Sequence, residues 1–282
     1  MPELPEVQNI AAALQTEIVG LCITKIYVKK PSIIKGPLKS TWKKTAQILT
    51  NARITAVTRR AKRLILCTDN NLALIFQLGM TGKFLISTPS TPQEKHAHIL
   101  INFNNNKQLR FIDPRRFGRL WFVQNLDPID PDPAMHAAGL NKLGPEPDKI
   151  TLKQFQQILN SQRVIKNLLL DQTRLAGLGN IYADESLHAA RIHPQTPANT
   201  LNNPQIRQLR TAIRRILKRA IAYGGTTFSD FRNPYGDMGR FWKFIKVYQK
   251  NNTPCPRCHT NIQKIAISNR SAHFCPRCQT LK

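Results

Sequence analysis

Four cysteines near the C-terminus restrict the fold of this chain more tightly than any other feature of its sequence. They form two pairs with two residues inside each pair, and sixteen residues separate the pairs: Cys255, Cys258, Cys275 and Cys278. Two such pairs joined by a hairpin present four thiolates tetrahedrally, and this spacing lies in the range of a zinc ribbon. Because the cysteines fill every ligand position, we predict one structural Zn²⁺ that stabilises a segment too short to bury a core.

The N-terminal half reads as one helix followed by a series of short strands. Apolar residues recur at helical spacing from residue 5 to about residue 19, whereas the later runs are rich in β-branched and aromatic residues. Eight short strands favour a β-sandwich or a barrel, and we expect a sandwich. The predicted strands are Ile23–Lys30, Arg53–Thr58, Arg63–Thr68, Leu72–Leu78, Lys83–Ser87, His98–Phe103, Gln108–Ile112 and Gly118–Val123.

Proline and glycine interrupt regular structure after the predicted strands, in Asp127–Pro133 and again in Gly144–Pro147. Such segments are typical of linkers between domains. Helical patterns dominate from about residue 151, and Gly224 with Gly225 suits a helix stop. We therefore predict an α+β multidomain chain. Its parts are an N-terminal β-sandwich domain with a leading helix at 1–130, a linker at 131–150, a helical domain at 151–225, a connector at 226–245 and the zinc ribbon hairpin at 246–282.

The charge balance indicates a polyanionic partner. The chain carries 42 Lys and Arg against 16 Asp and Glu, a net charge of +26. Nucleic acid is the first candidate, although a basic solvated surface would give the same composition. No apolar run approaches the roughly 18–20 residues of a membrane span, and the first residues lack the pattern of a secretion signal. We expect a cytoplasmic protein with no membrane partner.

The N-terminus offers an unusual nucleophile. Removal of Met1 turns the nitrogen of Pro2 into a secondary amine, and an α-amine with a pKa near roughly 8 keeps a neutral fraction at physiological pH. A secondary amine that attacks a sugar carbon forms an iminium directly, and the neighbouring Glu3 or Glu6 is placed to donate a proton. An ordinary helix entry with acidic residues near its start accounts for the same residues.

Seven segments resemble bacterial formamidopyrimidine-DNA glycosylase, and they follow one another in order over nearly the whole chain. They are Pro2–Val7, Arg59–Lys62, Gln77–Gly82, Asp113–Gly118, Gly177–Glu185, Gly224–Thr227 and the C-terminal ribbon. The resemblance implies an enzyme of base excision repair that acts on 8-oxoguanine and formamidopyrimidines in duplex DNA, both as a glycosylase and as an AP lyase. It also implies a helix-two-turn-helix domain at 151–225, a lesion-capping loop within 226–245 and a zinc finger at 246–282.

The resemblance assigns catalytic roles to four residues. Pro2 is implied to attack C1′ of the damaged nucleotide and Glu3 to donate a proton. Lys62 corresponds to the lysine of β-elimination, and Arg270 to the hairpin arginine of phosphate binding and δ-elimination. The residues themselves leave plainer alternatives, since Lys62 lies in a predicted basic strand and Arg270 is equally an ordinary surface arginine.

Further residues correspond to DNA contacts of the family. A nucleotide that leaves the base stack opens a gap that an enzyme must fill. The residues implied to fill it are Met80, Arg115 and Phe117, and their turn-rich settings favour exposed positions. The residues implied to contact the DNA backbone or strands are His96, Arg115 and Asn180. Arg163 is a further candidate, on a segment where the lysine that some family members use is shifted to Ser161 or Gln162.

Two other functions are consistent with parts of the sequence. The related endonuclease VIII type shares the architecture but prefers oxidised pyrimidines, and Leu4 with the Met80–Arg115–Phe117 set favours the purine enzyme. A non-catalytic zinc-ribbon DNA-binding protein would not require the four catalytic residues together. We expect a monomer in the bacterial cytoplasm, associated with the nucleoid when bound to damaged duplex DNA. The segment Asn233–Gly236 departs from the commoner pattern of the capping loop.

Overall fold

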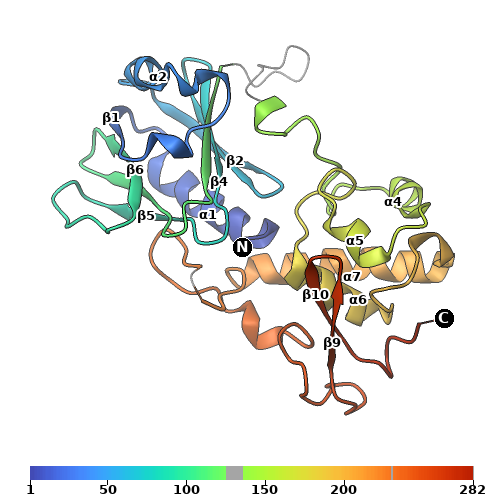
Figure 1. The fold of residues 1–282 in the computed structure, drawn as a ribbon. Helices are drawn as coiled ribbons and strands as arrows, with labels where there is room; N and C mark the ends of the chain where they lie inside the picture. Colours follow the sequence, from blue (N-terminus) through green and yellow to red (C-terminus); the bar gives the residue numbers. More distant parts are fainter. Residues whose placement is uncertain (125–135, 230, 282) are drawn as a thin grey trace. The chain divides into compact units, whose positions relative to one another are not determined.

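The computed structural model describes residues 1–124, 136–229 and 231–281 of the chain. They form two compact units, which Figure 1 draws in sequence colours. Unit 1 comprises Met1–Lys142 and Tyr223–Arg240, and unit 2 comprises Leu143–Ala222 and Phe241–Lys282. The proline-rich stretch at 127–133 lies outside the described residues, so the linker assignment stays a prediction.

Unit 1 begins with helix α1, Leu4–Ile18, as the apolar periodicity predicts. Pro5 lies in its first turn, where the missing N–H costs no helical hydrogen bond, and the carboxylate of Glu6 accepts the backbone N–H of Glu3 at 2.8 Å. One face of α1 is buried in the core of unit 1 and packs on strands β2, Ile54–Arg60, and β3, Arg63–Thr68. Both its cap and its packing against the core therefore fix the start of the helix.

Two four-stranded antiparallel sheets form the rest of unit 1, with strand orders β1-β6-β7-β5 and β2-β3-β4-β8. Their inward residues share one apolar core, so the predicted β-sandwich is confirmed. The strands lie within a few residues of the predicted ranges. They are β1 Ile23–Val28, β2 Ile54–Arg60, β3 Arg63–Thr68, β4 Leu72–Gln77, β5 Lys83–Ser87, β6 Ala97–Phe103, β7 Gln108–Ile112 and β8 Arg119–Gln124.

The structure adds short helical elements that we did not predict. Between β1 and β2 lie the 3-10 turns η1, Pro31–Ile33, and η2, Pro37–Lys39, and the helix α2, Trp42–Ile48. Seven residues are too few to give a clear helical periodicity, so α2 depends on its packing against the core.

Unit 2 contains the helices that the second half of the chain predicts. They are α4 Leu152–Leu159, α5 Ile165–Leu170, α6 Asn180–Ala190 and α7 Asn203–Ala222, with the 3-10 turns η3 Ala198–Thr200 and η4 Phe241–Phe244. Helices α6 and α7 lie side by side around a second apolar core (Figure 1). Residues 143–150 belong to this unit, since Gly144 N–H donates to the carbonyl of Gln172 at 2.9 Å.

The C-terminal part of unit 2 is a two-stranded hairpin of β9, Gln263–Ile267, and β10, Arg270–Phe274. The buried ammonium of Lys166 on α5 binds the carboxylate of Asp184 on α6 and the carbonyl of Ser271. Asp184 also accepts the backbone N–H of His273 at 2.9 Å. This network holds β10 against α6, where Figure 1 draws it. Among the described residues, no helix is both long and apolar enough to span a bilayer.

Candidate functional site

Pro2 and Glu3 lie together in the structured part of unit 1, at the entrance to α1. Both residues are buried, and Glu3 is the N-cap of the helix, whereas Met1 is 54% exposed. The helix start therefore holds the predicted nucleophile next to an acidic group and leaves the preceding methionine accessible.

Glu6 caps the start of α1 and also binds a part of the chain that is distant in sequence. Its Oε2 accepts the N–H of Glu3 at 2.8 Å, and its Oε1 accepts the N–H of Thr226 at 2.7 Å. Both carboxylate oxygens of Glu6 therefore accept backbone N–H groups. A glutamate three residues after the N-cap is the signal of a capping box, but the bond to Thr226 has no signal in the sequence.

The glycine before Thr226 allows this approach. A Cβ on Gly225 would lie 2.7 Å from Oε1 of Glu6, and the backbone φ of Gly225 is +79°. A side chain would both clash and strain the backbone. Gly225 thus lets the loop that starts there reach the helix entrance of the same unit.

Lys62 lies in the tight turn between β2 and β3, and so not in the continuous basic strand that the sequence offered as the plainer alternative. Arg60 pairs with Arg63 across the hairpin, and Ala61 adopts a positive φ of 52°, which a two-residue turn requires. Arg59 donates to the side-chain oxygen of Gln8 on α1 at 2.9 Å. Lys62 is half-buried in this turn, next to a strand that is bonded to α1.

The three residues implied to fill the gap in DNA come from two loops that unit 1 brings together. Met80 is 45% exposed and Phe117 is 49% exposed, which confirms their predicted exposure. The guanidinium carbon of Arg115 lies 4.8 Å from the centre of the Phe117 ring. Apolar side chains of this size are usually buried, so their exposure marks a candidate contact surface.

Asp113 joins these two loops, and we did not identify it from the sequence. Its fully buried carboxylate accepts the hydroxyl of Thr81 at 2.5 Å and the N–H of Gly118 at 2.6 Å. The backbone of Gly79 comes so close to the second loop that a Cβ there would lie 2.7 Å from the carbonyl carbon of Phe117. The predicted Met80–Arg115–Phe117 set therefore rests on one buried acid and one glycine.

His96 lies at the same end of unit 1. It precedes β6, is half-buried, and its carbonyl accepts the N–H of Asp113 at 3.0 Å. The neighbouring His98 is buried and bonded to the carbonyl of Asp113. Burial lowers the pKa of His98, although its contacts with Asp113 act in the opposite direction. Of these two histidines, His96 is the more accessible.

The tip of the loop at 226–240 contacts the β-sandwich of its own unit. The backbone N–H of Ile86, on edge strand β5, donates to the carbonyl of Pro234 at 3.0 Å. The hydroxyl of Tyr235 donates to Glu17 at 3.0 Å, and Lys107 binds the same carboxylate at 2.8 Å. The hydrogen bond from Lys107 is the main reason that the pKa of Glu17 lies below its ordinary value.

Asn180 begins helix α6 in unit 2. The side-chain oxygen of Gln172 accepts the N–H of Gly177, and its amide nitrogen donates to the carbonyl of Leu178, both at 2.9 Å. These bonds shape the turn that leads into the helix. Oδ1 of Asn180 is buried without a hydrogen-bond partner among the described residues. The backbone N–H groups at the N-terminus of α6 are suited to a phosphate, whereas Oδ1 of Asn180 is an acceptor and would need a donor.

Arg163 is exposed, but its guanidinium binds the carboxylate of Asp171 at 2.7 Å within unit 2. The nearby Lys166 is fully buried in its pair with Asp184. Any DNA contact of Arg163 therefore competes with Asp171.

Arg270 is exposed beside the turn between β9 and β10, as the predicted hairpin tip requires. Asn167 donates to the hydroxyl of Ser268 at 3.0 Å and fastens this turn to α5.

The four cysteines fit a zinc ion. Their Sγ atoms lie within 4.8 Å of one another, and Cys258 Sγ is 3.4 Å from the Sγ atoms of Cys275 and Cys278. Thiolates bound at about 2.3 Å in a tetrahedron are separated by about 3.8 Å, whereas disulfide sulfurs lie about 2.05 Å apart. The N–H groups of Arg257 and Cys278 point at the sulfurs of Cys255 and Cys275, at 3.5 and 3.4 Å. Such donors stabilise thiolates.

Family models match three parts of the chain. They describe the formamidopyrimidine-DNA glycosylase N-terminal domain at residues 1–120, the H2TH domain of the same enzymes at 143–232, and a zinc finger found in FPG and IleRS at 253–281. The formamidopyrimidine-DNA glycosylases of Pelotomaculum thermopropionicum and Latilactobacillus sakei are each 39% identical to the chain. The first aligns over 100% of both chains, and the second over 99% of this chain and 98% of its own.

Solved structures of related enzymes are similar to this chain along nearly its whole length. Lactococcus lactis Fpg in complex with DNA that contains an abasic site has a TM-score of 0.88 and 35% identity, covering 99% of both chains. MutM in complex with DNA that contains carbocyclic 8-oxo-G has a TM-score of 0.88 and 36% identity, covering 99% of this chain and 100% of that one. The resemblance in the sequence is thereby confirmed, and the chain belongs to the formamidopyrimidine-DNA glycosylase family.

Proposed function

We propose that the chain is a bifunctional DNA glycosylase and AP lyase that removes 8-oxoguanine and formamidopyrimidines from duplex DNA. The observation that carries the proposal is the burial of Pro2 and Glu3 at the capped start of α1. An ordinary helix entry does not need a buried acid beside the terminal nitrogen. Membership of the family, and relatives in complex with damaged DNA, support the same activity.

Pro2 is the proposed nucleophile. Once Met1 is removed, the Pro2 nitrogen attacks C1′ of the damaged nucleotide and the bond from C1′ to the base breaks. The base leaves with the proton that the Pro2 nitrogen loses. Glu3 donates a proton to the ring oxygen, so the sugar opens and an iminium forms between the Pro2 nitrogen and C1′. With Met1 present the same nitrogen is a tertiary amide without a nucleophilic lone pair.

Strand cleavage follows from the iminium, which withdraws electrons from C2′. Transfer of the C2′ proton to water expels the 3′ phosphate by β-elimination, and transfer of the C4′ proton to water in a second elimination expels the 5′ phosphate from C5′. We assign proton donation in the first step to Lys62 and phosphate binding in the second to Arg270. An arginine forms two parallel hydrogen bonds to one phosphate, which suits the departing group.

We assign the remaining residues to DNA binding. The gap left by the extruded nucleotide is filled by Met80, Arg115 and Phe117. Backbone and strand contacts are assigned to His96, Arg115, Arg163 and Asn180. One Zn²⁺ held by the four cysteines would be structural, because they leave no open coordination position for a substrate. We further propose the domain boundaries given above, with residues 143–150 counted with the helical part that they contact, a monomer, and action in the bacterial cytoplasm.

Borohydride reduction during turnover tests the proposal, because it traps the iminium as a covalent adduct between protein and DNA. Protein with a free Pro2 amine should give an adduct with a duplex that carries 8-oxoguanine opposite cytosine, and protein that retains Met1 should not. Absence of an adduct from the free amine would refute the lyase mechanism. Faster cleavage of a thymine glycol duplex would instead favour the endonuclease VIII type of substrate.

A further inference from the structure

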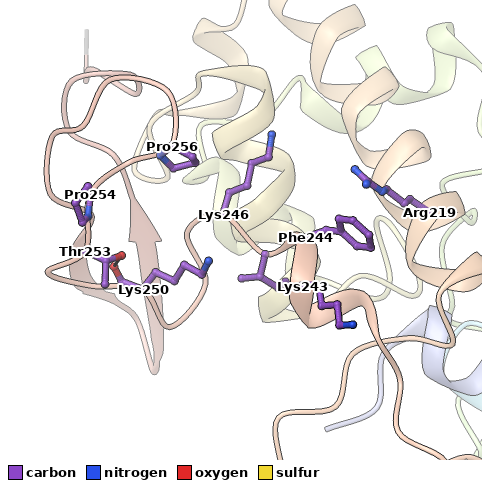
Figure 2. A pocket seen from close by; sticks show the side chains of 9 residues that line it. Arg219, Lys243, Phe244, Lys246, Lys250, Thr253, Pro254 and Pro256 are labelled. Atoms are coloured by element: carbon purple, nitrogen blue, oxygen red, sulfur yellow. Dashed lines mark hydrogen bonds between the residues drawn. The ribbon is translucent and has the colours of Figure 1, made fainter.

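Unit 2 contains a basic hollow that the proposed function does not use. We call it the α7–knuckle hollow. Its volume is 540 Å³, and it lies between the end of α7, the segment that includes η4, and the first cysteine pair. Figure 2 shows the side chains that line it, which are Arg219, Lys243, Phe244, Ile245, Lys246, Lys250, Thr253, Pro254 and Pro256.

Four of these nine residues are cationic and none is acidic. Glu185 is the acid behind this segment, but its carboxylate is buried and accepts the backbone N–H groups of Lys246, Val247 and Tyr248 at 2.8–3.1 Å. Glu185 therefore binds the backbone of this segment, and the side chains of Lys243, Lys246 and Lys250 are exposed. Like charges around one hollow repel one another, and an anion bound there relieves the repulsion.

One end of the hollow is organised in advance. The guanidinium carbon of Arg219 lies 3.7 Å from the centre of the Phe244 ring, a stacked arrangement that restricts the orientation of the cation. Pro254 and Pro256 stand on the opposite side, next to Cys255, so the zinc-binding knuckle forms a wall. Proline offers no N–H donor, so recognition depends on the cationic side chains.

We propose that the α7–knuckle hollow binds phosphate groups of the DNA backbone outside the damaged nucleotide. The proposal rests on the proposed function, because a DNA repair enzyme meets this polyanion at every encounter. Lysine and arginine are the side chains that bind phosphate, and several point charges suit a chain of phosphates better than a single small anion. The hollow thereby extends the footprint of unit 2 on DNA.

The salt dependence of DNA binding tests this site. Lys246→Gln/Lys250→Gln removes two charges from the hollow, and Lys149→Gln/Lys153→Gln removes two from exposed positions elsewhere in unit 2. The affinity for DNA is measured over about 50–200 mM salt. One duplex extends well beyond the lesion on both sides and the other has only a few base pairs around it, and both carry a stable abasic analogue. We expect the hollow variant to lower the slope of log K against log salt by about 2 on the long duplex only.

Equal slopes for the hollow variant and the control on the long duplex would overturn the proposal. Pyrophosphate titrated into the free protein separates the two sources of phosphate. Saturable shifts of the lysine signals together with unchanged DNA slopes would overturn the DNA assignment in favour of a free phosphate ligand. Borohydride trapping, measured on the same variants, reports separately on the lyase activity.

A second inference rests on a different contact, between helix α6 and the first cysteine pair. His188 is fully buried in the last turn of α6, and its Nε2 lies 3.6 Å from Sγ of Cys255. Its Nδ1 is buried without a hydrogen-bond partner among the described residues. Arg257, between the two cysteines of the pair, donates to the carbonyl of His188 at 3.3 Å. The knuckle is thus joined to the helix end at two points.

A neutral imidazole carries one N–H, and a zinc-bound thiolate is an acceptor. With the hydrogen on Nε2, His188 donates to the thiolate and leaves only a bare acceptor at Nδ1; the other tautomer would leave a buried N–H unsatisfied, which costs more. We infer that His188 donates a hydrogen bond to Cys255 Sγ and stabilises the zinc-bound thiolate. His188 is a positioning residue for the metal site.

Replacement of His188 tests this contact without an activity assay. His188→Phe keeps a planar buried ring but removes the donor, and His188→Gln keeps an N–H donor. In the zinc-loaded protein we expect His188→Phe to transfer zinc to a chromogenic chelator at least about 10-fold faster, and His188→Gln to recover part of the difference. In the cobalt-substituted protein the sulfur-to-metal charge-transfer band should move to lower energy. Wild-type transfer rates and an unmoved band in His188→Phe would overturn the inference.

Discussion

Glu6 and Thr226 are separated by 220 positions in the chain, and Oε1 of Glu6 accepts the backbone N–H of Thr226 at 2.7 Å. The second oxygen of the same carboxylate accepts the N–H of Glu3. One buried acid therefore links the start of α1 to the start of the loop at 226–240. The position of the proposed nucleophile depends on a contact that lies far away in sequence.

Glu6→Gln should weaken this link. Glutamine presents one oxygen instead of two, so its amide group must face one of the backbone N–H donors of Glu3 or Thr226. We expect the free energy of unfolding to fall by about 1–3 kcal/mol and borohydride trapping to slow, while DNA affinity changes less. Urea unfolding followed by tryptophan fluorescence, trapping kinetics and fluorescence anisotropy measure the three effects. Exposed Asp148→Asn is the control, and equal behaviour of the two variants would contradict the role of Glu6.

Gly79→Ala should destabilise unit 1 more than Gly20→Ala. Both glycines have a positive φ, of 69° and 86°, so both substitutions strain the backbone by about 1–2 kcal/mol. Only at Gly79 does the new Cβ also meet backbone, 2.7 Å from the carbonyl carbon of Phe117, whereas nothing lies within 4 Å at Gly20. Urea unfolding compares the two. A similar loss of stability in both variants would contradict the prediction, because it would mean that the loop of Gly79 can move away from the loop of Phe117 at no cost.

Met80→Ala and Phe117→Ala should impair activity without impairing folding. Both side chains are about half exposed, so the free energy of unfolding should change by less than about 0.5 kcal/mol. Excision from duplex DNA should fall, because the gap in the base stack is no longer filled. Ile48→Ala, which alters a side chain that is 60% exposed on α2, is the control. Wild-type excision by the double variant would remove these residues from the proposed site.

The contact between Tyr235 and Glu17 should weaken in acid. The pKa of Glu17 lies below its ordinary value of 4.5, chiefly because of Lys107, so the contact is complete above pH 4.5 and is lost as the pH falls through the lowered pKa. Hydrogen exchange of the Ile86 N–H, which donates to Pro234, reports on this loop tip and should become faster in acid than the intrinsic rate predicts. Glu17→Gln should abolish that extra dependence, and its persistence in the variant would contradict the assignment.

The local sequence pattern was sufficient to predict those elements whose formation depends on residues close together in the chain. The eight strands and α1 follow from hydrophobic periodicity, because one face of each element must meet the core. The predicted strands Arg53–Thr58 and Arg63–Thr68 leave Lys62 between them, but a run of basic residues does not show whether the strand continues or a two-residue turn interrupts it. The turn became evident only from the pairing of Arg60 with Arg63.

The sequence by itself determined the family, the sandwich with its leading helix, the cysteine set suited to zinc and the exposure of Met80 and Phe117. Only the tertiary structure decided what Glu6, Asp113 and His188 contact. Each of these side chains bonds to a segment that is distant in the chain, and periodicity and short motifs carry no information about such pairs. Buried polar groups need partners wherever packing supplies them, so their roles are settled when the elements come together.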